Sequence, residues 1–186
     1  MVRGNATSEC VSVVCTVAWF PPRRTDVPMY QVLVGGILKS TPSNLLEYPW
    51  EDMVSFYLGC SFSFEEALSN AGVRVRNVEE KKNVAMFNTN IDLLPVGRFG
   101  GKMVVSMRPV KVVDLPLVVK VTMELPSAHG GPIHIGEPEK IGIVDINNPD
   151  FGESIDIKDD EVPVFWACGV TTFAALQYAG KYVCTS

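Results

Sequence analysis

The segment at 59–67 (GCSFSFEEA) constrains the fold most, because it fixes where a helix begins. Ser63 is followed three residues later by Glu66, the spacing of a capping box, in which each side chain satisfies a free backbone amide at the helix start. Apolar residues at helical spacing precede the segment. The sequence therefore predicts one helix around 49–58, a tight break, and a second helix around 63–71 that ends at Gly72.

The same turn collects reactive side chains. A thiol, two hydroxyls and two carboxylates follow one another at Cys60, Ser61, Ser63, Glu65 and Glu66. Free amides at a helix start attract anions and lower the pKa of a neighbouring thiol, which favours a binding or catalytic site. The alternative is only a well-capped helix behind a buried cysteine.

Composition limits the class of protein. The chain has 186 residues, of which 47% are hydrophobic and 20% charged, enough for one sizeable core or for one domain with a smaller insertion. A net charge of −5 without a run of Lys or Arg argues against nucleic acid, and no apolar stretch is long enough to span a bilayer. Five cysteines without a CxxC pair indicate reduced thiols in an intracellular compartment.

The remaining patterns predict alternating strands and helices. The apolar run at 11–20 reads as a buried strand, and Gly35 and Gly36 predict a hairpin within 30–38. Further strands are expected at 84–91, 102–107, 132–135 and 162–167, and a last helix at 171–178. For 114–125 strand and helix both stay open, because β-branched residues dominate while Asp114 and Pro116 suit a helix start. This irregular alternation indicates an α/β or α+β protein.

Polar residues follow several of these strands. Arg108, within SMRP at 106–109, is placed at a strand end, where α/β proteins keep their sites, and a guanidinium suits a carboxylate; the alternative is a surface salt bridge. The segment 88–90 (NTN) offers donors for a polar substrate or simply forms a turn. The junction at 161–172 (EVPVFWACGVTT) forms a second anion cradle, although core packing explains its aromatic residues equally well.

Both histidines of the chain lie in one glycine-rich segment at 129–136 (HGGPIHIG). Histidine carries protons near neutral pH, so His129 and His134 are candidates for acid–base catalysis. A tight turn with one histidine bound to backbone is the alternative. No third ligand stands at a suitable spacing, so we expect neither a metal nor another cofactor.

Five of these motifs together resemble the D-glutamate cyclase family, whose bacterial members are named as hydro-lyases. They occur in the family's order, from about Thr25 to Thr172: LGCSFSFEEAL, MFNTN, MVVSMRP, HGGPIHIGEPEKIGI and EVPVFWACGVT. The resemblance implies an α/β fold, with a three-layer α/β domain and a smaller inserted α+β domain. It places a divergent segment at 1–22 and the family domain at 23–186, with the insertion at about 110–160.

The implied reaction closes D-glutamate into 5-oxo-D-proline with loss of water. Under it, Arg108 holds one substrate carboxylate while amides near Ser61 or Gly169 cradle the other. Either histidine moves the proton, with Glu66 or Glu65 as the competing choice. The expected catalytic residues are His134, His129, Glu66 and Cys60, although for Cys60 a binding or packing role is preferred to nucleophilic attack. The expected substrate-binding residues are Arg108, Ser61, Ser63, Asn90, Ser106, Cys168, Gly169 and Thr171.

A non-catalytic alternative stays open. The family's usual first and last segments are not evident at 1–22 or after Gly180, so a truncated member could bind an acidic metabolite, or a full-length relative, without turnover. The expected partner is a small acidic amino acid, with neither nucleic acid nor membrane, and self-association to a homo-oligomer is left open. A bacterial source predicts a cytoplasmic protein, and an animal source predicts the mitochondrial matrix.

Overall fold

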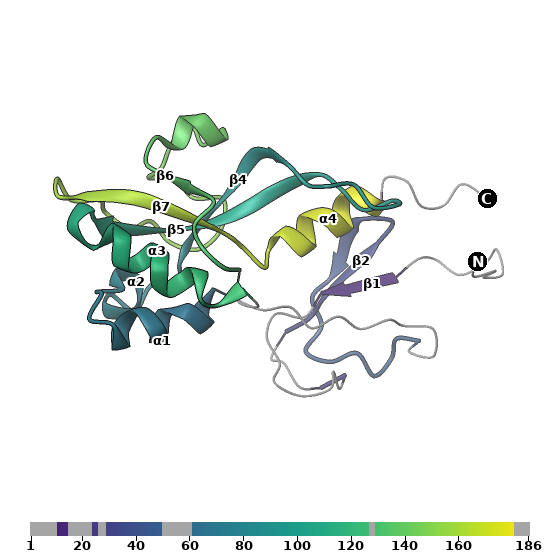
Figure 1. Ribbon diagram of the computed structural model, residues 1–186. Coiled ribbons are helices and arrows are strands. Elements are labelled where there is room, and N and C mark those ends of the chain that lie inside the picture. The colour runs from purple at the N-terminus through teal and green to yellow at the C-terminus, as the bar shows by residue number, and fades with distance from the viewer. Residues whose placement is uncertain (1–10, 15–23, 26–28, 50–60, 127–128, 181–186) are drawn as a thin grey trace. The chain divides into compact units, whose positions relative to one another are not determined.

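The computed structural model describes residues 11–14, 24–25, 29–49, 61–126 and 129–180, arranged in two compact units (Figure 1). The first unit comprises 1–58, 94–101 and 172–186, and the second comprises 59–93 and 102–171. Helices and antiparallel sheets are mixed, which confirms the predicted α/β class. The helix predicted at 49–58 lies outside the described residues except for Pro49, and Cys60 lies outside them too.

The first unit holds a three-stranded antiparallel sheet in the order β1 (Val11–Val14), β2 (Gln31–Val34) and β3 (Ile37–Ser40). The predicted hairpin is confirmed. Gly35 and Gly36 form its turn with φ values of +57° and +77°, which glycine adopts without strain. A side chain at Gly36 would also meet backbone, because its Cβ would lie 2.9 Å from the Cα of Gly180.

Gly180 ends the last helix, α4 (Thr171–Gly180), which confirms the helix predicted at 171–178 and extends it by two residues.

The second unit is built on a four-stranded antiparallel sheet. Its strand order is β4 (Ala85–Asp92), β5 (Lys102–Lys111), β7 (Glu161–Ala167) and β6 (His134–Ile135). In the register between β5 and β7, Ser106 lies opposite Trp166, and Arg108 lies opposite Val164. Side chains alternate along a strand, so these residues share one face of the sheet, and Met107 and Phe165 share the other.

The strand predicted at 102–107 was too short. β5 continues to Lys111, so Arg108 lies inside the strand and not at its end. The strand passes through proline because Pro109 pairs with Pro163 of β7, so both missing amides fall at one position of the ladder. The strand predicted at 132–135 was too long and contains only His134 and Ile135.

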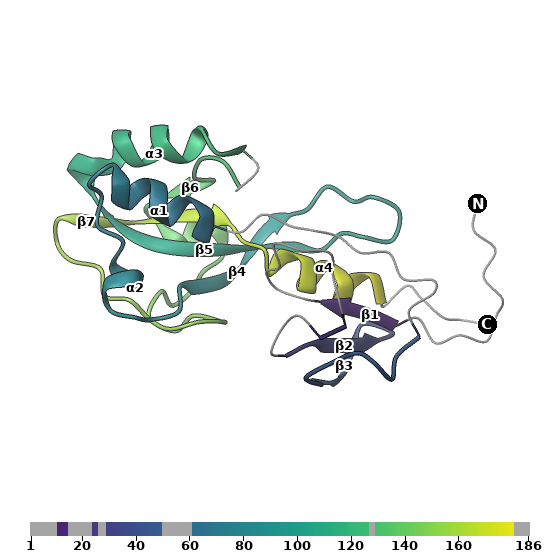
Figure 2. The same ribbon diagram turned by 90° about the horizontal axis from the view of Figure 1, so that it is seen from below.

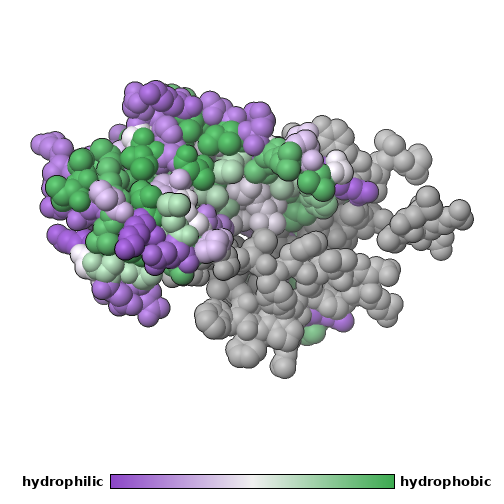
Figure 3. Space-filling model, viewed as in Figure 1, coloured by the Kyte–Doolittle hydropathy of each residue, from purple (hydrophilic) through white to green (hydrophobic). Residues whose placement is uncertain are grey.

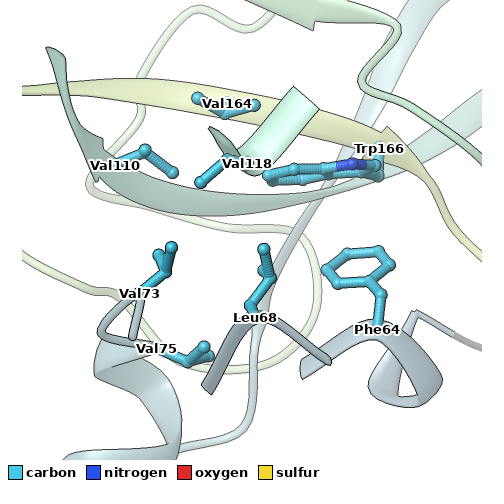
Figure 4. Packing of buried hydrophobic residues seen from close by; sticks show 8 residues of the cluster. All are labelled: Phe64, Leu68, Val73, Val75, Val110, Val118, Val164 and Trp166. Atoms are coloured by element: carbon cyan, nitrogen blue, oxygen red, sulfur yellow. The ribbon is translucent and has the colours of Figure 1, made fainter. Parts of the chain in front are cut away.

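Helices α1 (Phe62–Asn70) and α3 (Leu115–Met123) cover the Arg108 face of the sheet, and Figure 2 shows them side by side there. The short helix α2 (Arg76–Glu79) follows α1. Between this layer and the sheet lies one apolar cluster, drawn in Figure 4. Its buried members are Phe64, Leu68, Val73, Val75, Val110, Val118, Val164 and Trp166.

The helix starts differ in part from prediction. In the segment 114–125 the helix alternative holds, over Leu115–Met123, preceded by a short 3-10 turn η1 (Val112–Asp114), with Asp114 as N-cap and proline in the first turn. The capping box was wrong for α1, because Ser61 is the N-cap and Ser63 lies inside the helix. Ser61 makes no side-chain capping bond, because its hydroxyl instead accepts a hydrogen bond from Arg108. Gly72, with φ of +82°, follows the C-cap Ala71 as predicted for the helix end.

The opposite face of the sheet is covered by the 3-10 helix η3 (Pro138–Ile141) and the residues that follow it, in the segment that continues from β6 (Figure 1). This second cluster contains Ala85, Phe87, Val105, Met107, Ile141, Ile143 and Phe165. Hydrophobic side chains also reach the surface of the unit, as Figure 3 shows. Among them are Val112, Val113, Leu117 and Met123 in η1 and α3. None of the helices in the described ranges has the length and apolar character that crossing a membrane requires.

Two valines test this packing. Val118 lies in α3 and is completely buried, whereas Val113, in the preceding turn η1, is 82% exposed. We expect Val118→Ala to lower the free energy of unfolding by about 1 to 3 kcal/mol, because buried methyl groups are lost and a cavity remains. Val113→Ala is the matched control, with a change within about 0.5 kcal/mol. Urea unfolding followed by circular dichroism measures both, and equal effects would contradict this account of the core.

Candidate functional site

A buried ion pair stands at the centre of the second unit. Arg108 of β5 is only 3% exposed, and its Nε donates to Oε1 of Glu65 over 3.0 Å. Its Nη2 donates to the same oxygen. Glu65 lies in the first turn of α1, where a carboxylate also meets the positive end of the helix dipole. A desolvated guanidinium needs such a partner, so this pair fixes α1 on the sheet.

Two serine hydroxyls also accept hydrogen bonds from the guanidinium of Arg108. Nη1 of Arg108 donates to the hydroxyl of Ser106 over 3.2 Å, and Nη2 donates to that of Ser61 over 3.3 Å. Both serines are buried. Each hydroxyl accepts from Arg108, so its own hydrogen is the one that it can donate to a ligand oxygen.

Aromatic rings lie against the same cation. The Cζ atom of Arg108 lies 4.7 Å from the centroid of the Phe64 ring and 5.8 Å from that of the Trp166 ring. The two rings are themselves 5.0 Å apart. The negative faces of the rings attract the guanidinium, and their apolar bulk keeps water away from it. The charge of Arg108 therefore acts in a medium of low polarity, where electrostatic effects are strong.

Three buried polar atoms near this pair have no hydrogen-bond partner among the described residues. They are Oδ1 of Asn77, Nε2 of His129 and Nε1 of Trp166. The amide nitrogen of Asn77 does have a partner, since it donates to Oε1 of Glu65 over 3.2 Å. Most buried polar atoms are paired, so a group of unpaired ones beside a buried charge has the chemistry of a ligand site.

His129 follows α3 in a loop, with a left-handed φ of +82°. Burial of the imidazole lowers the pKa of His129 below its ordinary value, and the positive charge of Arg108 lowers it further. The ring is therefore neutral near pH 7 and able to accept a proton.

The structure brings together several residues that the sequence singled out. Arg108, Ser61, Ser106 and His129 all belong to this arrangement, which we call the Arg108 cluster together with Glu65, Asn77, Phe64 and Trp166. Of the two adjacent carboxylates of α1, Glu65 is buried in the cluster and Glu66 is exposed.

Other candidate residues lie elsewhere. The ring of His134 lies 5.9 Å from that of Phe165, on the opposite face of the sheet, and its Nε2 is 3.0 Å from the carbonyl oxygen of Glu137. Asn90 is exposed on β4. Thr171 bonds through its hydroxyl to both backbone polar atoms of Val104, each over 3.0 Å.

Two further candidates are near the junction after β7. The thiol of Cys168 is buried against the sulfur of Met86, 3.4 Å away, and Gly169 follows in the turn before α4. Ser63 lies in α1, but the structure does not describe its side chain. Cys60 is not among the described residues.

Sequence reasoning did not select Asn77, Phe64 or Trp166 for the site. Asn77 lies in the four-residue helix α2, for which no pattern was recognised. For Trp166 the sequence leaves core packing and a site open as alternatives, and it gives Phe64 no role. Both are core residues, and both also line the cation. The part of the chain that the structure describes contains no group of three or more His, Cys, Asp or Glu side chains placed to hold a metal.

A separate cavity of about 200 Å³ lies along the last residues of β5, at Pro109, Val110 and Lys111. Charged side chains of both signs line it, namely Arg74, Arg76, Lys111, Lys158, Glu79, Asp114 and Glu161. Arg74 pairs with Glu79 over 2.7 Å, and Arg76 pairs with Glu161. None of the three buried polar atoms left unpartnered in the described structure belongs to a residue that lines this cavity, which makes the cavity a weaker candidate than the Arg108 cluster.

Comparison with known proteins relates this chain to one family. The family described as D-glutamate cyclase matches residues 54–186. Proteins named "Putative hydro-lyase" are similar to this chain in several bacteria. Identity is 54% over 156 residues for that of Bacillus licheniformis, 51% over 161 for that of Verminephrobacter eiseniae, and 53% over 148 for that of Bacillus subtilis. These alignments cover 84%, 87% and 80% of this chain, but only 60%, 59% and 58% of the relatives.

Glu65 and Glu66 offer a matched pair for testing the buried ion pair. We expect Glu65→Gln to lower the free energy of unfolding by about 3 to 5 kcal/mol, because the buried guanidinium of Arg108 then loses the charge of a hydrogen-bonded carboxylate. Glu66→Gln removes an exposed carboxylate and changes stability by less than about 0.5 kcal/mol. Chemical denaturation of both variants is the measurement. Similar losses in the two would show that Glu65 does not compensate Arg108.

The depressed pKa of His129 is directly observable, since the chain has only two histidines. We expect its imidazole to titrate below the ordinary value of about 6.5 in a nuclear magnetic resonance titration, with His129→Gln identifying the signal. The unfolded chain takes up this proton first as pH falls. This contribution to stability is therefore complete above about pH 6.5 and is lost progressively below it. An imidazole of His129 that titrates above 6.5 would contradict the burial argument.

Proposed function

Since this chain belongs to the D-glutamate cyclase family, we propose that it is a hydro-lyase that closes D-glutamate into 5-oxo-D-proline with release of water. The observation that carries this proposal is a buried guanidinium beside a histidine whose pKa is held low. Together they offer a binding charge for an acidic substrate and a neutral base for its amine. The relatives' names support a hydro-lyase, and the family's description supports the substrate.

The reaction sets clear demands. The α-nitrogen of glutamate attacks the carbon of the γ-carboxyl group, so that a carbon–nitrogen bond forms and a carbon–oxygen bond breaks. The ammonium group loses two protons on the way to the lactam, and both leave with one carboxyl oxygen as water. An enzyme must therefore take a proton from the nitrogen, stabilise negative charge on the attacked carboxyl, and protonate the departing oxygen.

The Arg108 cluster meets these demands with few groups. Its guanidinium attracts a substrate carboxylate, and the hydroxyls of Ser61 and Ser106 donate to that carboxylate's oxygens. Glu65 holds the guanidinium in one orientation, as a positioning residue. His129 takes a proton from the ammonium nitrogen and delivers it to the leaving oxygen, and the same transfer of the second proton releases that oxygen as water. His134, Asn90 and Thr171 have no part in this proposal because of where they lie.

Chiral chromatography of 5-oxoproline after incubation with D- or L-glutamate tests the proposal. We expect product from the D isomer alone. His129→Gln should lower kcat by about 10²- to 10⁴-fold, the usual contribution of a general base, whereas His134→Gln should retain activity within a few-fold. The two histidines thus control for each other.

Two results would reject parts of this proposal. Loss of turnover in His134→Gln with full activity in His129→Gln would move the base to the other face of the sheet. Tight D-glutamate binding by the folded protein without product would favour the alternative, a non-catalytic protein that binds an acidic metabolite.

A further inference from the structure

Trp166 carries a buried donor that the described protein leaves unused. The side chain is completely buried, and its Nε1 has no hydrogen-bond partner among the described residues. An indole nitrogen can only donate, and buried tryptophans usually find an acceptor for it. An apolar ring such as phenylalanine would fill this core without that cost, so the N–H calls for another explanation.

The donor lies within the Arg108 cluster. Trp166 stands opposite Ser106 on the central strands, on the same face as Arg108, and its ring lies 5.8 Å from the Cζ atom of that arginine. In Figure 4 the ring edge that carries the nitrogen is turned away from Val110 and Val118, toward the end of the cluster where Phe64 lies. The nitrogen therefore lies at the Phe64 end of the cluster, and the Phe64 ring is the one against which the Arg108 guanidinium packs, 4.7 Å from its centroid.

A second unpartnered atom points to the same kind of ligand. Nε2 of His129 is also buried without a partner in the described structure, and His129 is near enough to Arg108 for the arginine's charge to act on it. An imidazole that donates from its other nitrogen accepts at Nε2. A ligand that offers an oxygen to the indole and an N–H to the imidazole would satisfy both atoms, and an amino acid offers both.

We propose that Trp166 binds the substrate, and that its Nε1–H donates to an oxygen of the carboxyl group under attack. This inference rests on the cyclase reaction proposed above. As the amine adds to the carboxyl carbon, negative charge grows on that oxygen, so the hydrogen bond strengthens toward the transition state. The neighbouring guanidinium stabilises the same charge in a medium of low polarity.

Kinetics of Trp166→Phe with D-glutamate test the role. Removing one such donor is expected to lower kcat by about 10²-fold with little change in KM, because the interaction is made mainly in the transition state. Val118→Ala is the control, because it opens the same apolar cluster without removing a polar atom, and it should keep its kcat. If Trp166→Phe does not fold, 3-benzothienylalanine at position 166 replaces only the N–H by sulfur and gives the same test.

A direct readout separates binding from packing. The chain has three tryptophans, and the indole N–H signal of Trp166 is the one that disappears in the variant. We expect 5-oxo-D-proline, the product, to move that signal downfield in the wild-type protein. Unchanged kcat in the variant, or an indole signal that does not move while His129 responds to the product, would overturn this inference and leave the cyclase proposal intact. A folded wild-type protein that does not turn over D-glutamate would overturn both.

Discussion

The contact between Glu65 and Arg108 determines how the second unit is organised. A guanidinium in the middle of a central strand loses its hydration on folding, and a carboxylate with additional hydrogen bonds must compensate it. That carboxylate comes from α1, and Asn77 of α2 supports it from the side. A shift of α1 would unpair the two charges, and a shift of α2 would remove the amide hydrogen bond to Glu65. The ion pair thus specifies where the helical layer lies on the sheet, whatever its net contribution to stability.

This constraint explains why local rules fail at the start of α1. A serine before a helix ordinarily satisfies the free amides there, but Ser61 directs its oxygen to Arg108 instead. The helix forms nevertheless, because Phe64 and Leu68 bury one side of it against the sheet. Residues that depart from a local preference, here that of serine for capping a helix, are typical of functional sites.

Local signals in the sequence predicted most of the helices and strands, whereas the choice of site residues stays a prediction. Glycines and periodic apolar residues located the hairpin at Gly35, the helix before Gly72 and the strand that holds Trp166, because these signals are local. The end of β5 was misplaced because its continuation past Pro109 depends on the pairing with Pro163, which is distant in sequence. The predicted insertion at about 110–160 lies within the second unit, and its boundaries stay a prediction.

The choice between Glu65 and Glu66, and between His129 and His134, also depends on contacts between residues that are distant in sequence. On α1, Glu65 precedes the buried Leu68 by three residues and so shares its side of the helix, a relation that the sequence contained. For the two histidines no such relation exists. Strand pairing sets His134 against Phe165 on one face of the sheet, while the loop after α3 keeps His129 near Arg108 on the other. The five-residue spacing between the two histidines in the sequence does not indicate that they lie on opposite faces of the sheet.

A permanent cation beside a base has one further consequence for the proposed reaction. Burial and, second to it, the charge of Arg108 lower the pKa of His129, so an imidazolium formed alone would be unfavourable. A substrate carboxylate bound at Arg108 offsets that charge and raises the proton affinity of the imidazole. In the proposed reaction, substrate binding therefore raises the proton affinity of His129. The proton that His129 takes up is then transferred to the leaving oxygen, which departs as water. A neutral substrate analogue gives the same imidazole no such help, so selectivity for an acidic substrate follows from the base as well as from the binding charge.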